Sequence, residues 1–372
     1  MAYLGEDIKK LGFGLMRLPK KDGAIDVDEV SGMVDRFLEA GFTYFDTAWA
    51  YEGSEEAARK ALVERHPRES YQLATKCAAW IDCETADDAK RQLQVSLDRT
   101  GAGYFDFYLL HNLGETRTEA FDSFGMWDWV QEQKQAGLVR HVGFSFHSTA
   151  DELDRLLTAH PEMEFVQLQV NWADWEDPAI QSRACLDVAR RHGKPVVVME
   201  PVKGGMLATP PEPVRDIFRA AEPESSYASW ALRFAASQSG VLTVLSGMST
   251  PEQMEDNIAT MRGFDRLTDS QTRTVGEAQE ALASIPLVPC TSCNYCAKVC
   301  PRNVAVSAAF SALNLLTLYG NREAAAKKLS SLATRNDRAL PDACVKCGAC
   351  EEACPQHIAI REELDRAVAE LL

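Results

Sequence analysis

Eight of the eleven cysteines lie in two strings that share one spacing, C-x2-C-x2-C-x3-C-P. In proteins with this spacing, three thiolates of a string bind one iron-sulfur cluster and the fourth binds the other cluster. We therefore predict two 4Fe-4S clusters that exchange one ligand between the strings. The first cluster is assigned Cys290, Cys293, Cys296 and Cys354, and the second is assigned Cys344, Cys347, Cys350 and Cys300.

Two other uses of cysteine fit the strings less well. A zinc ribbon needs two separated C-x2-C pairs, which leaves the third and fourth cysteines and the following prolines without a role. A disulfide framework is typical of secreted chains, but residues 1–7 contain neither a basic region nor an apolar stretch. Cys77, Cys83 and Cys185 lie outside the strings and are assigned no role, because free buried cysteine is common.

The bulk composition indicates a soluble, globular protein. A chain of 372 residues is long enough for one large domain and one small one. The formal net charge of -16 argues against nucleic acid as a partner, since phosphate binding needs clustered Lys and Arg. No apolar run approaches the length of a membrane span. We expect no membrane partner and a cytoplasmic location.

Short β-rich runs alternate with longer amphipathic segments from Leu11 to about Gly263, which is the pattern of repeated βα units. Strands are expected at residues 12–18, 43–47, 72–76, 105–111, 139–144, 165–170, 195–200 and 241–246. Helices are expected at residues 27–40, 54–64, 86–99, 151–158, 178–191 and 251–260. Eight such units predict an α/β fold, the (β/α)8 TIM barrel.

A second, smaller domain is expected after the barrel. Residues 269–284 have the pattern of one more helix, and residues 285–289 form a stiff, proline-containing linker into the first cysteine string. Residues 304–318 and 322–334 have helical periodicity. We therefore predict a barrel over residues 1–285 and a mainly helical, ferredoxin-like iron-sulfur domain over residues 286–372.

In a TIM barrel the chemistry is carried by residues at the C-terminal ends of the strands. Asp46, Lys76 and His111 close the second, third and fourth expected strands, and Tyr51 follows Asp46 in the loop. A tyrosine phenol has a pKa near 10, and a nearby cation such as Lys76 lowers it. The pattern predicts Tyr51 as a proton donor, Lys76 and Asp46 as the groups that tune it, and His111 as the residue that orients a substrate oxygen.

Simpler interpretations of these residues remain open. Asp46 and Lys76 are compatible with a structural ion pair in the barrel rim. His111 is compatible with a histidine whose hydrogen bonds are all made within the rim and which has no catalytic role. The loops after the strands also hold four tryptophans, for which two interpretations are open: an apolar, aromatic wall for a flat or cyclic substrate, or, for half of them, simple packing. These are Trp49, Trp80, Trp172 and Trp175.

The barrel sequence resembles the aldo/keto reductases. The resemblance is carried by F-D-T-A-x-x-Y-x-x-S-E at residues 45–55, by Lys76 and His111, and by S-G-M-S-x-x-x-Q-x-x-x-N at residues 246–257. It covers roughly residues 8–262, and residues 285–358 resemble bacterial two-cluster ferredoxins. The chain is thus similar to the branch of that family that carries a C-terminal ferredoxin-type domain.

The resemblance implies a barrel that binds NADPH or NADH without a Rossmann fold. It gives Tyr51 the part of general acid. Ser145 and Gln167 would hold the nicotinamide carboxamide, and Ser249, Gln253 and Asn257 would approach the adenosine end. The last segment offers no cation, so a preference between NADPH and NADH is not predicted.

Three functions are compatible with these features. In the first, the chain is an oxidoreductase that interconverts a carbonyl and an alcohol by hydride transfer, and the clusters are structural or sense redox state. In the second, the clusters exchange single electrons with a ferredoxin or flavoprotein partner. In the third, the chain is a non-enzymatic redox-sensing regulator, but a regulator has no need of a tuned phenol.

Overall fold

The computed structural model describes residues 4–114 and 117–372, and it divides into two compact units. The first unit runs up to Ala208 and resumes over Glu224–Val275. The second unit comprises Thr209–Pro223 and Gly276–Leu372. The domain boundary near residue 285 stays a prediction.

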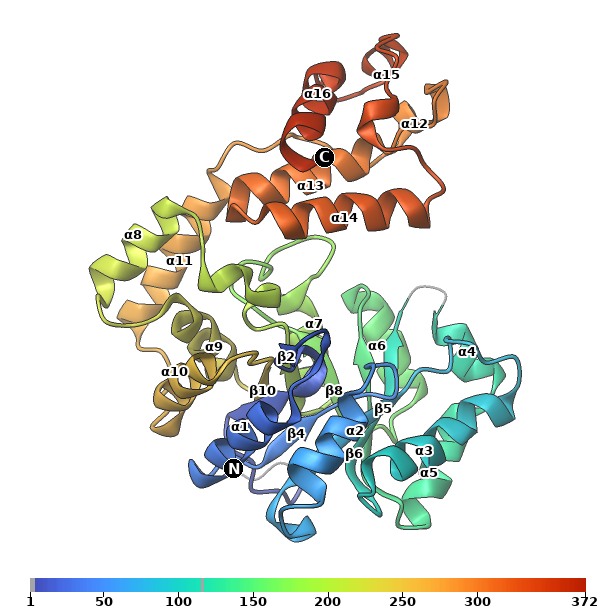
Figure 1. Cartoon of the computed structure of the whole chain (residues 1–372), viewed down its shortest axis with the longest axis vertical. Coiled ribbons are helices and arrows are strands. Elements are labelled where there is room, and N and C mark those ends of the chain that lie inside the picture. Colours follow the sequence, from blue (N-terminus) through green and yellow to red (C-terminus); the bar gives the residue numbers. More distant parts are fainter. Residues whose placement is uncertain (1–3, 115–116) are drawn as a thin grey trace. The chain divides into compact units, whose positions relative to one another are not determined.

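The first unit contains a closed barrel of eight parallel strands in the order β1-β10-β9-β8-β7-β6-β5-β4 (Figure 1). This confirms the predicted TIM barrel. Its strands are β1 Leu11–Gly14, β4 Tyr44–Asp46, β5 Gln72–Cys77, β6 Phe105–Leu113, β7 Val139–Phe146, β8 Phe165–Gln169, β9 Val196–Met199 and β10 Val241–Ser246. A separate antiparallel hairpin of β2 (Lys20–Lys21) and β3 (Ala24–Ile25), which the sequence pattern did not predict, follows β1.

Helices connect the barrel strands. They are α1 Val27–Glu39, α2 Ser54–Ala58, α3 Ala86–Thr100, α4 Thr118–Ser123, α5 Met126–Gln135, α6 Ala150–Ala159, α7 Ser182–Arg191, α9 Tyr227–Ser237 and α10 Pro251–Arg262. A π-helical turn, Arg59–Val63, extends α2, and 3-10 turns lie at Arg68–Ser70 and Lys203–Ala208. The helices named from the sequence do not include α4, α5 and α9. In α9 nearly consecutive residues are buried, so its sequence lacks the amphipathic period that marks a surface helix.

The first strand is shorter than its sequence predicts. We expected it to extend over residues 12–18, but β1 ends at Gly14 and the chain turns into a 3-10 helix, Leu15–Arg17. Arg17 therefore leaves the sheet and lies at the C-terminal rim of the barrel. This turn matters for the site described below.

The inside of the barrel has an apolar layer toward the N-terminal ends of the strands. Tyr44, Phe107, Phe165 and Val197 pack together there, each fully buried. Side chains two residues apart on a strand point to the same face. Asp46 and Gln167 therefore share the barrel interior with Tyr44 and Phe165, one layer nearer the C-terminal rim. Inside the barrel, a polar layer therefore lies on the C-terminal side of an apolar layer.

An ionic cluster ties β7 to the segment that enters β8. Glu164 accepts hydrogen bonds from the Lys134 Nζ at 2.6 Å and the Val142 N–H at 3.0 Å, and it contacts His141 Nδ1 at 3.2 Å. Burial alone would raise the pKa of Glu164, but these partners outweigh it and lower the pKa to about 2. The ionised carboxylate therefore stabilises the fold.

We expect Glu164→Gln to lower the melting temperature at pH 7, and this deficit to shrink as the pH falls from about 4.5 to about 2. The folded-state pKa is depressed, so the contribution of Glu164 is present above the unfolded-state pKa and is lost as the carboxylate is protonated. After allowance for solvent screening we expect about 1–2 kcal/mol. Thermal unfolding of this variant and of the control Glu162→Gln at pH 7 and pH 3 measures it. A deficit that does not depend on pH would contradict the assignment.

The second unit is mainly helical, as predicted. It contains α8 Glu212–Ala221, α12 Tyr295–Val299, α13 Val306–Tyr319, α14 Arg322–Arg335, α15 Ala349–Glu352 and α16 Ile360–Leu371, with a 3-10 turn at Pro341–Ala343 and most of α11, Asp269–Ala283. Helices α13, α14 and α16 pack against one another (Figure 1). Over residues 4–114 and 117–372, no helix combines the length and the apolar character that a membrane crossing requires.

Candidate active site

Asp46, Lys76 and His111 lie at the C-terminal rim of three neighbouring strands, as the sequence predicted. Asp46 ends β4, Lys76 lies near the end of β5, and His111 lies near the end of β6. The pairing of β6 with β7 shifts register between Leu110 and Leu113, next to His111. Polar side chains of three adjacent strands therefore converge in the barrel interior.

Lys76 is fully buried and is held by Asp46. Its Nζ lies 2.5 Å from Asp46 Oδ1 and donates a second hydrogen bond to the Thr47 carbonyl at 2.7 Å. Burial alone would lower the pKa of Lys76, but Asp46 and Tyr51 outweigh it and raise that pKa. Burial raises the pKa of Asp46, while Lys76 and a hydrogen bond from the Gln167 side chain at 3.1 Å oppose this. Lys76 is therefore a protonated cation beneath the site.

Tyr51 lies between Lys76 and His111. The Lys76 Nζ is 5.1 Å from the centroid of the Tyr51 ring, and the His111 ring meets that ring edge-on at 5.7 Å between centroids. The sequence predicted that Lys76 lowers the pKa of Tyr51. It does, but burial is the larger effect and the pKa of Tyr51 is raised above 10 overall. Because the phenol stays protonated, Tyr51 is suited to donate a proton.

His111 is half-buried, and its ring is neutral. Burial is the main cause that holds its pKa well below 6.5, and the charge of Lys76 adds to it. Its Nδ1 is buried without a hydrogen-bond partner among the described residues. The His111 carbonyl accepts a hydrogen bond from the Trp80 indole N–H at 2.9 Å. A buried ring nitrogen without a partner is rare.

These residues open onto a cavity of about 640 Å³, a volume within the range of ligand sites. Asp46, Tyr51 and His111 line it. Of the four tryptophans expected to form a wall, only Trp80 is among its lining residues. Trp172 is fully buried and Trp175 packs on Phe234. The expected wall is thus a single indole.

The residues that the resemblance assigns to the cofactor lie in or beside this cavity. Gln167, Ser249, Gln253 and Asn257 line it, whereas Ser145 is buried just behind. The Ser145 hydroxyl accepts a hydrogen bond from the Asn112 N–H at 2.7 Å. Asn112 itself lines the cavity in the left-handed conformation (φ 63°), and sequence analysis had not singled it out. Its position is a consequence of the irregular end of β6.

The start of α10 is organised by hydrogen bonds within the protein. Thr250 caps the helix, Gln253 accepts from the Ser249 N–H at 2.8 Å, and the Asn257 side chain donates to Ser246 Oγ at 2.9 Å. The Ser249 hydroxyl donates to the Arg17 carbonyl at 2.6 Å. An elongated, phosphate-bearing ligand fits a cavity that ends at a helix N-terminus. The residues present therefore fit a nicotinamide dinucleotide.

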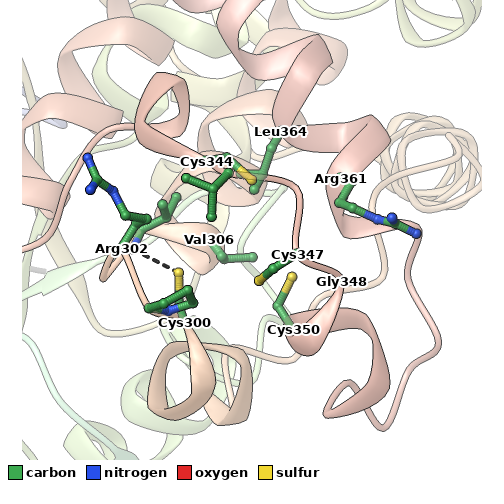
Figure 2. A pocket seen from close by; sticks show the side chains of 12 residues that line it. Cys300, Arg302, Val306, Cys344, Cys347, Gly348, Cys350, Arg361 and Leu364 are labelled. Carbon is green, nitrogen blue, oxygen red and sulfur yellow. Dashed lines mark hydrogen bonds between the residues drawn. The ribbon is translucent and has the colours of Figure 1, made fainter.

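The second unit brings together the four cysteines predicted for the second cluster. Cys300, Cys344, Cys347 and Cys350 line one small cavity, together with Arg302 and Arg361 among others (Figure 2). Backbone N–H groups donate to two of these sulfurs, from Val304 to Cys300 at 3.3 Å and from Lys346 to Cys344 at 3.4 Å. One thiol from the first string thus joins three from the second string.

The four cysteines predicted for the first cluster also gather. Burial raises the pKa of the Cys296 thiol, and the nearby thiols of Cys290, Cys293 and Cys354 raise it further. Among the described residues, no three His, Cys, Asp or Glu side chains have the spacing of a site for a single metal ion. Each cysteine of a 4Fe-4S cluster binds a different iron, so four thiols at wider spacing are compatible with a cluster.

Comparisons with known proteins agree with both units. The model of the aldo/keto reductase family matches residues 10–280, and that of the 4Fe-4S dicluster domain matches residues 289–359. An aldo-keto reductase of Mycolicibacterium vanbaalenii is 29% identical over 63% of this chain and 79% of its own length. Aldo-keto reductase AKR2E4 of Bombyx mori is 29% identical over 44% of this chain. The match spans only 55% of the length of that relative.

Solved structures show the same fold. Aldo-keto reductase AKR11C1 of Bacillus halodurans superimposes with a TM-score of 0.59 at 23% identity, over 76% of this chain and 96% of its own. An aldo/keto reductase of Klebsiella pneumoniae, solved with NADP and acetate, superimposes with a TM-score of 0.57 at 20% identity. The match covers 72% of this chain and 90% of that one. The family match covers more than half of the residues. The chain therefore belongs to the aldo/keto reductase family, a family of oxidoreductases, and carries a 4Fe-4S dicluster domain C-terminal to its barrel.

Proposed function

We propose that this protein interconverts a carbonyl and an alcohol by hydride transfer with NADPH or NADH, with Tyr51 as general acid and base. One observation carries the proposal: Asp46, Tyr51 and His111 line a single cavity, and the buried Lys76 ammonium lies 5.1 Å from the centroid of the Tyr51 ring. The Klebsiella pneumoniae relative, whose structure holds NADP, supports a nicotinamide dinucleotide as the cofactor. The family match supports the same chemistry.

The residues of the chain divide the proton chemistry among them. A bound nicotinamide would supply the hydride. Tyr51 would donate its proton to the carbonyl oxygen, and Lys76 would stabilise the phenolate that this leaves, with Asp46 holding the lysine charged and in place. His111 would hold the carbonyl oxygen through a ring N–H and fix its position. In alcohol oxidation the same phenolate would take the proton back.

The side chains around the cavity support a small substrate with an apolar or cyclic part. Trp80 is 38% exposed, and its indole is fixed to the backbone beside the His111 ring. Ile81 and Met199 also line the cavity. Ser145 and Gln167 lie together where β7 pairs with β8, and we propose that they hold the carboxamide of the nicotinamide. Ser249, Gln253 and Asn257 would approach the adenosine end.

A second candidate function is electron transfer through two 4Fe-4S clusters to a ferredoxin or flavoprotein. The dicluster match favours it, and so do Cys293 and Cys347, which are exposed, since clusters near the surface exchange electrons with partners readily. Each cluster would take one electron, whereas a hydride carries two, so a flavin partner would have to split the pair. The eight cysteines fit these clusters in the two groups described above.

We expect no bleaching of the cluster absorbance near 400 nm when NADPH or NADH is added to iron-replete protein under anaerobic conditions, because a nicotinamide does not readily give up single electrons. Dithionite is the positive control and should bleach it. Spectra taken alongside a panel of cyclic and aromatic aldehydes and ketones measure turnover at the same time. Bleaching by nucleotide alone would favour the electron-transfer candidate, and nucleotide binding without turnover on any substrate would contradict the reductase.

A further inference from the structure

One short helix of the second unit presents an exposed face that is both apolar and cationic. Helix α12 lies inside the first cysteine string and carries Tyr295, Lys298 and Val299, whose spacing of three and four residues places them on one side of the helix. Tyr295 is 51% exposed and Val299 is 43% exposed. The Lys298 Nζ lies 5.4 Å from the centroid of the Tyr295 ring, so the cation and the ring form one group. We call these three residues the α12 face.

Exposed apolar side chains gather around the predicted clusters. Among the described residues, seven large apolar side chains are exposed, and three of them stand between or beside cluster cysteines: Tyr295, Val299 and Val345. Val299 precedes Cys300, which lines the cavity of the second predicted cluster together with Val345. Single exposed apolar residues are common, whereas neighbouring ones mark surfaces that bind a partner.

The second string has the same cysteine spacing but lacks this face. Its helix α15 stands at the equivalent position, and Ala349, Glu352 and Ala353 take the places of the three residues of the α12 face. Each helix buries one cysteine, Cys296 in α12 and Cys350 in α15. The repeat therefore accommodates small and acidic residues at these positions. The tyrosine, lysine and valine of α12 are not required by the cluster-binding spacing.

The charge around the α12 face is opposite to that of the whole chain. The formal net charge is -16, but residues 290–302 contain Lys298 and Arg302 and no acidic residue. Arg302 is exposed and lines the cavity of the second predicted cluster (Figure 2). A basic partner would be attracted to the chain as a whole and repelled at this face, whereas an acidic partner would be repelled by the chain as a whole and attracted here. Charge therefore directs an acidic protein to the α12 face.

The ionic groups of the second string balance one another. The Lys346 Nζ lies 2.8 Å from the Asp365 carboxylate, and the Arg361 guanidinium lies 2.7 Å from the Glu351 carboxylate. Glu352 is exposed on α15. The excess of positive charge therefore belongs to the first string, and an acidic partner gains little at α15.

We propose that the α12 face docks a small acidic flavoprotein that carries single electrons. The tyrosine and the valine would supply apolar contact area, and the two cations would pair with carboxylates of the partner. Helix α12 carries Cys296 and leads into Cys300, which belong to different predicted clusters, so a partner docked here lies close to both. A flavin suits this place because it links one-electron carriers to two-electron hydride chemistry. The proposal rests on the second candidate function, electron transfer through the clusters.

The test is the dissociation constant of an acidic flavodoxin, in its oxidised form, for the intact, cluster-loaded protein, measured by calorimetry. The triple variant Tyr295→Ala, Lys298→Glu, Val299→Ala gives α12 the residues that α15 already has. It should weaken binding by about a hundredfold. Tyr295→Ala alone should weaken it by about tenfold to thirtyfold, as for an aromatic residue at the centre of an interface. Lys298→Glu alone should weaken it by about tenfold, and this difference should shrink as salt is added.

Lys327→Glu and Leu372→Ala are the matched controls. They make comparable changes at exposed residues outside both strings, on α14 and at residue 372, and they should leave the dissociation constant unchanged. Iron and sulfide analysis checks that each variant keeps both clusters; where the triple variant does not, the single variants decide.

Three results would overturn the proposal. They are a wild-type protein that does not bind flavodoxin, variants of the α12 face that bind it as tightly as the wild type, and self-association of the protein that the triple variant abolishes. Sedimentation velocity detects the last of these, which would make the α12 face a contact between two copies of the chain.

A rate measurement separates this inference from the second candidate function. Protein reduced with dithionite and freed of it should convert oxidised flavodoxin to the neutral semiquinone, since one electron passes from a reduced cluster to the flavin and the flavin takes a proton from solvent. Docking at the α12 face without reduction of either flavodoxin or benzyl viologen would contradict the second candidate function. Reduction of benzyl viologen without flavodoxin binding would contradict only this inference.

Discussion

Carbonyl reduction by a Tyr51→Phe variant should be slower than that of the wild-type protein by about two to four orders of magnitude. The substitution removes the hydroxyl but keeps the ring, which packs edge-on against His111. It therefore removes the proton donor without opening the site. The quantity to measure is kcat with the best substrate of the panel, at saturating NADPH or NADH.

Two further measurements make the Tyr51 result interpretable. Nucleotide affinity should change by no more than about twofold, because the phenol is expected to act on the substrate oxygen. Tyr104→Phe is the matched control, since Tyr104 accepts a hydrogen bond from Arg140 and does not line the cavity; it should keep full activity. If Tyr51→Phe keeps full activity, Tyr51 is not the general acid and the proposed mechanism is wrong.

A Cys300→Ala variant should lose about half of the iron and sulfide of the protein, and it should lose the second cluster although Cys300 belongs to the first string. Iron and sulfide analysis of anaerobically purified protein measures the loss. Cys83→Ala is the control, since Cys83 lies outside both strings. Loss of Cys300 leaves three thiols at the cavity of Figure 2. Three ligands hold a four-iron cluster less securely than four.

Pairs of substitutions decide how the strings are wired. Cys300→Ala combined with Cys347→Ala affects one predicted cluster twice, so its iron content should equal that of the single variant. Cys300→Ala combined with Cys293→Ala affects both predicted clusters, so nearly all iron should be lost. Cys293 and Cys347 are both exposed, which makes the two pairs comparable. The opposite pattern would show that each string binds its own cluster.

The barrel and the positions of its polar residues were predictable from local patterns. Buried parallel strands give continuous apolar runs, and Asp46, Lys76 and His111 lie at or near the C-terminal ends of β4, β5 and β6. Adjacent strand ends then bring these residues together without further information. The fixed spacing of the repeat likewise predicted that Cys300 groups with Cys344, Cys347 and Cys350, which line one cavity with it; that it binds their cluster stays a prediction.

Other features depend on contacts that no local pattern contains. The net effect on the pKa of Tyr51 is set by burial, which depends on what closes over the ring. Arg17 was missed because residues 12–18 were expected to be one strand, whereas the chain turns at Leu15. Its ion-pair partner, Glu200, follows β9, and β9 lies next but one to β1 only because the barrel closes. A contact between residues of strands this far apart in the sequence becomes visible only once the closed barrel is known.

The hydrogen bond from the Trp80 indole to the His111 carbonyl has a consequence for how this protein can change over evolution. The same bond fixes the wall of the cavity and the backbone that carries His111. A smaller residue at position 80 would admit a bulkier molecule, but it would also release the end of β6. Substrate range and catalytic rate are therefore not independent at this position. New specificities are reached more easily through Ile81, whose side chain lines the cavity and is not engaged in that bond.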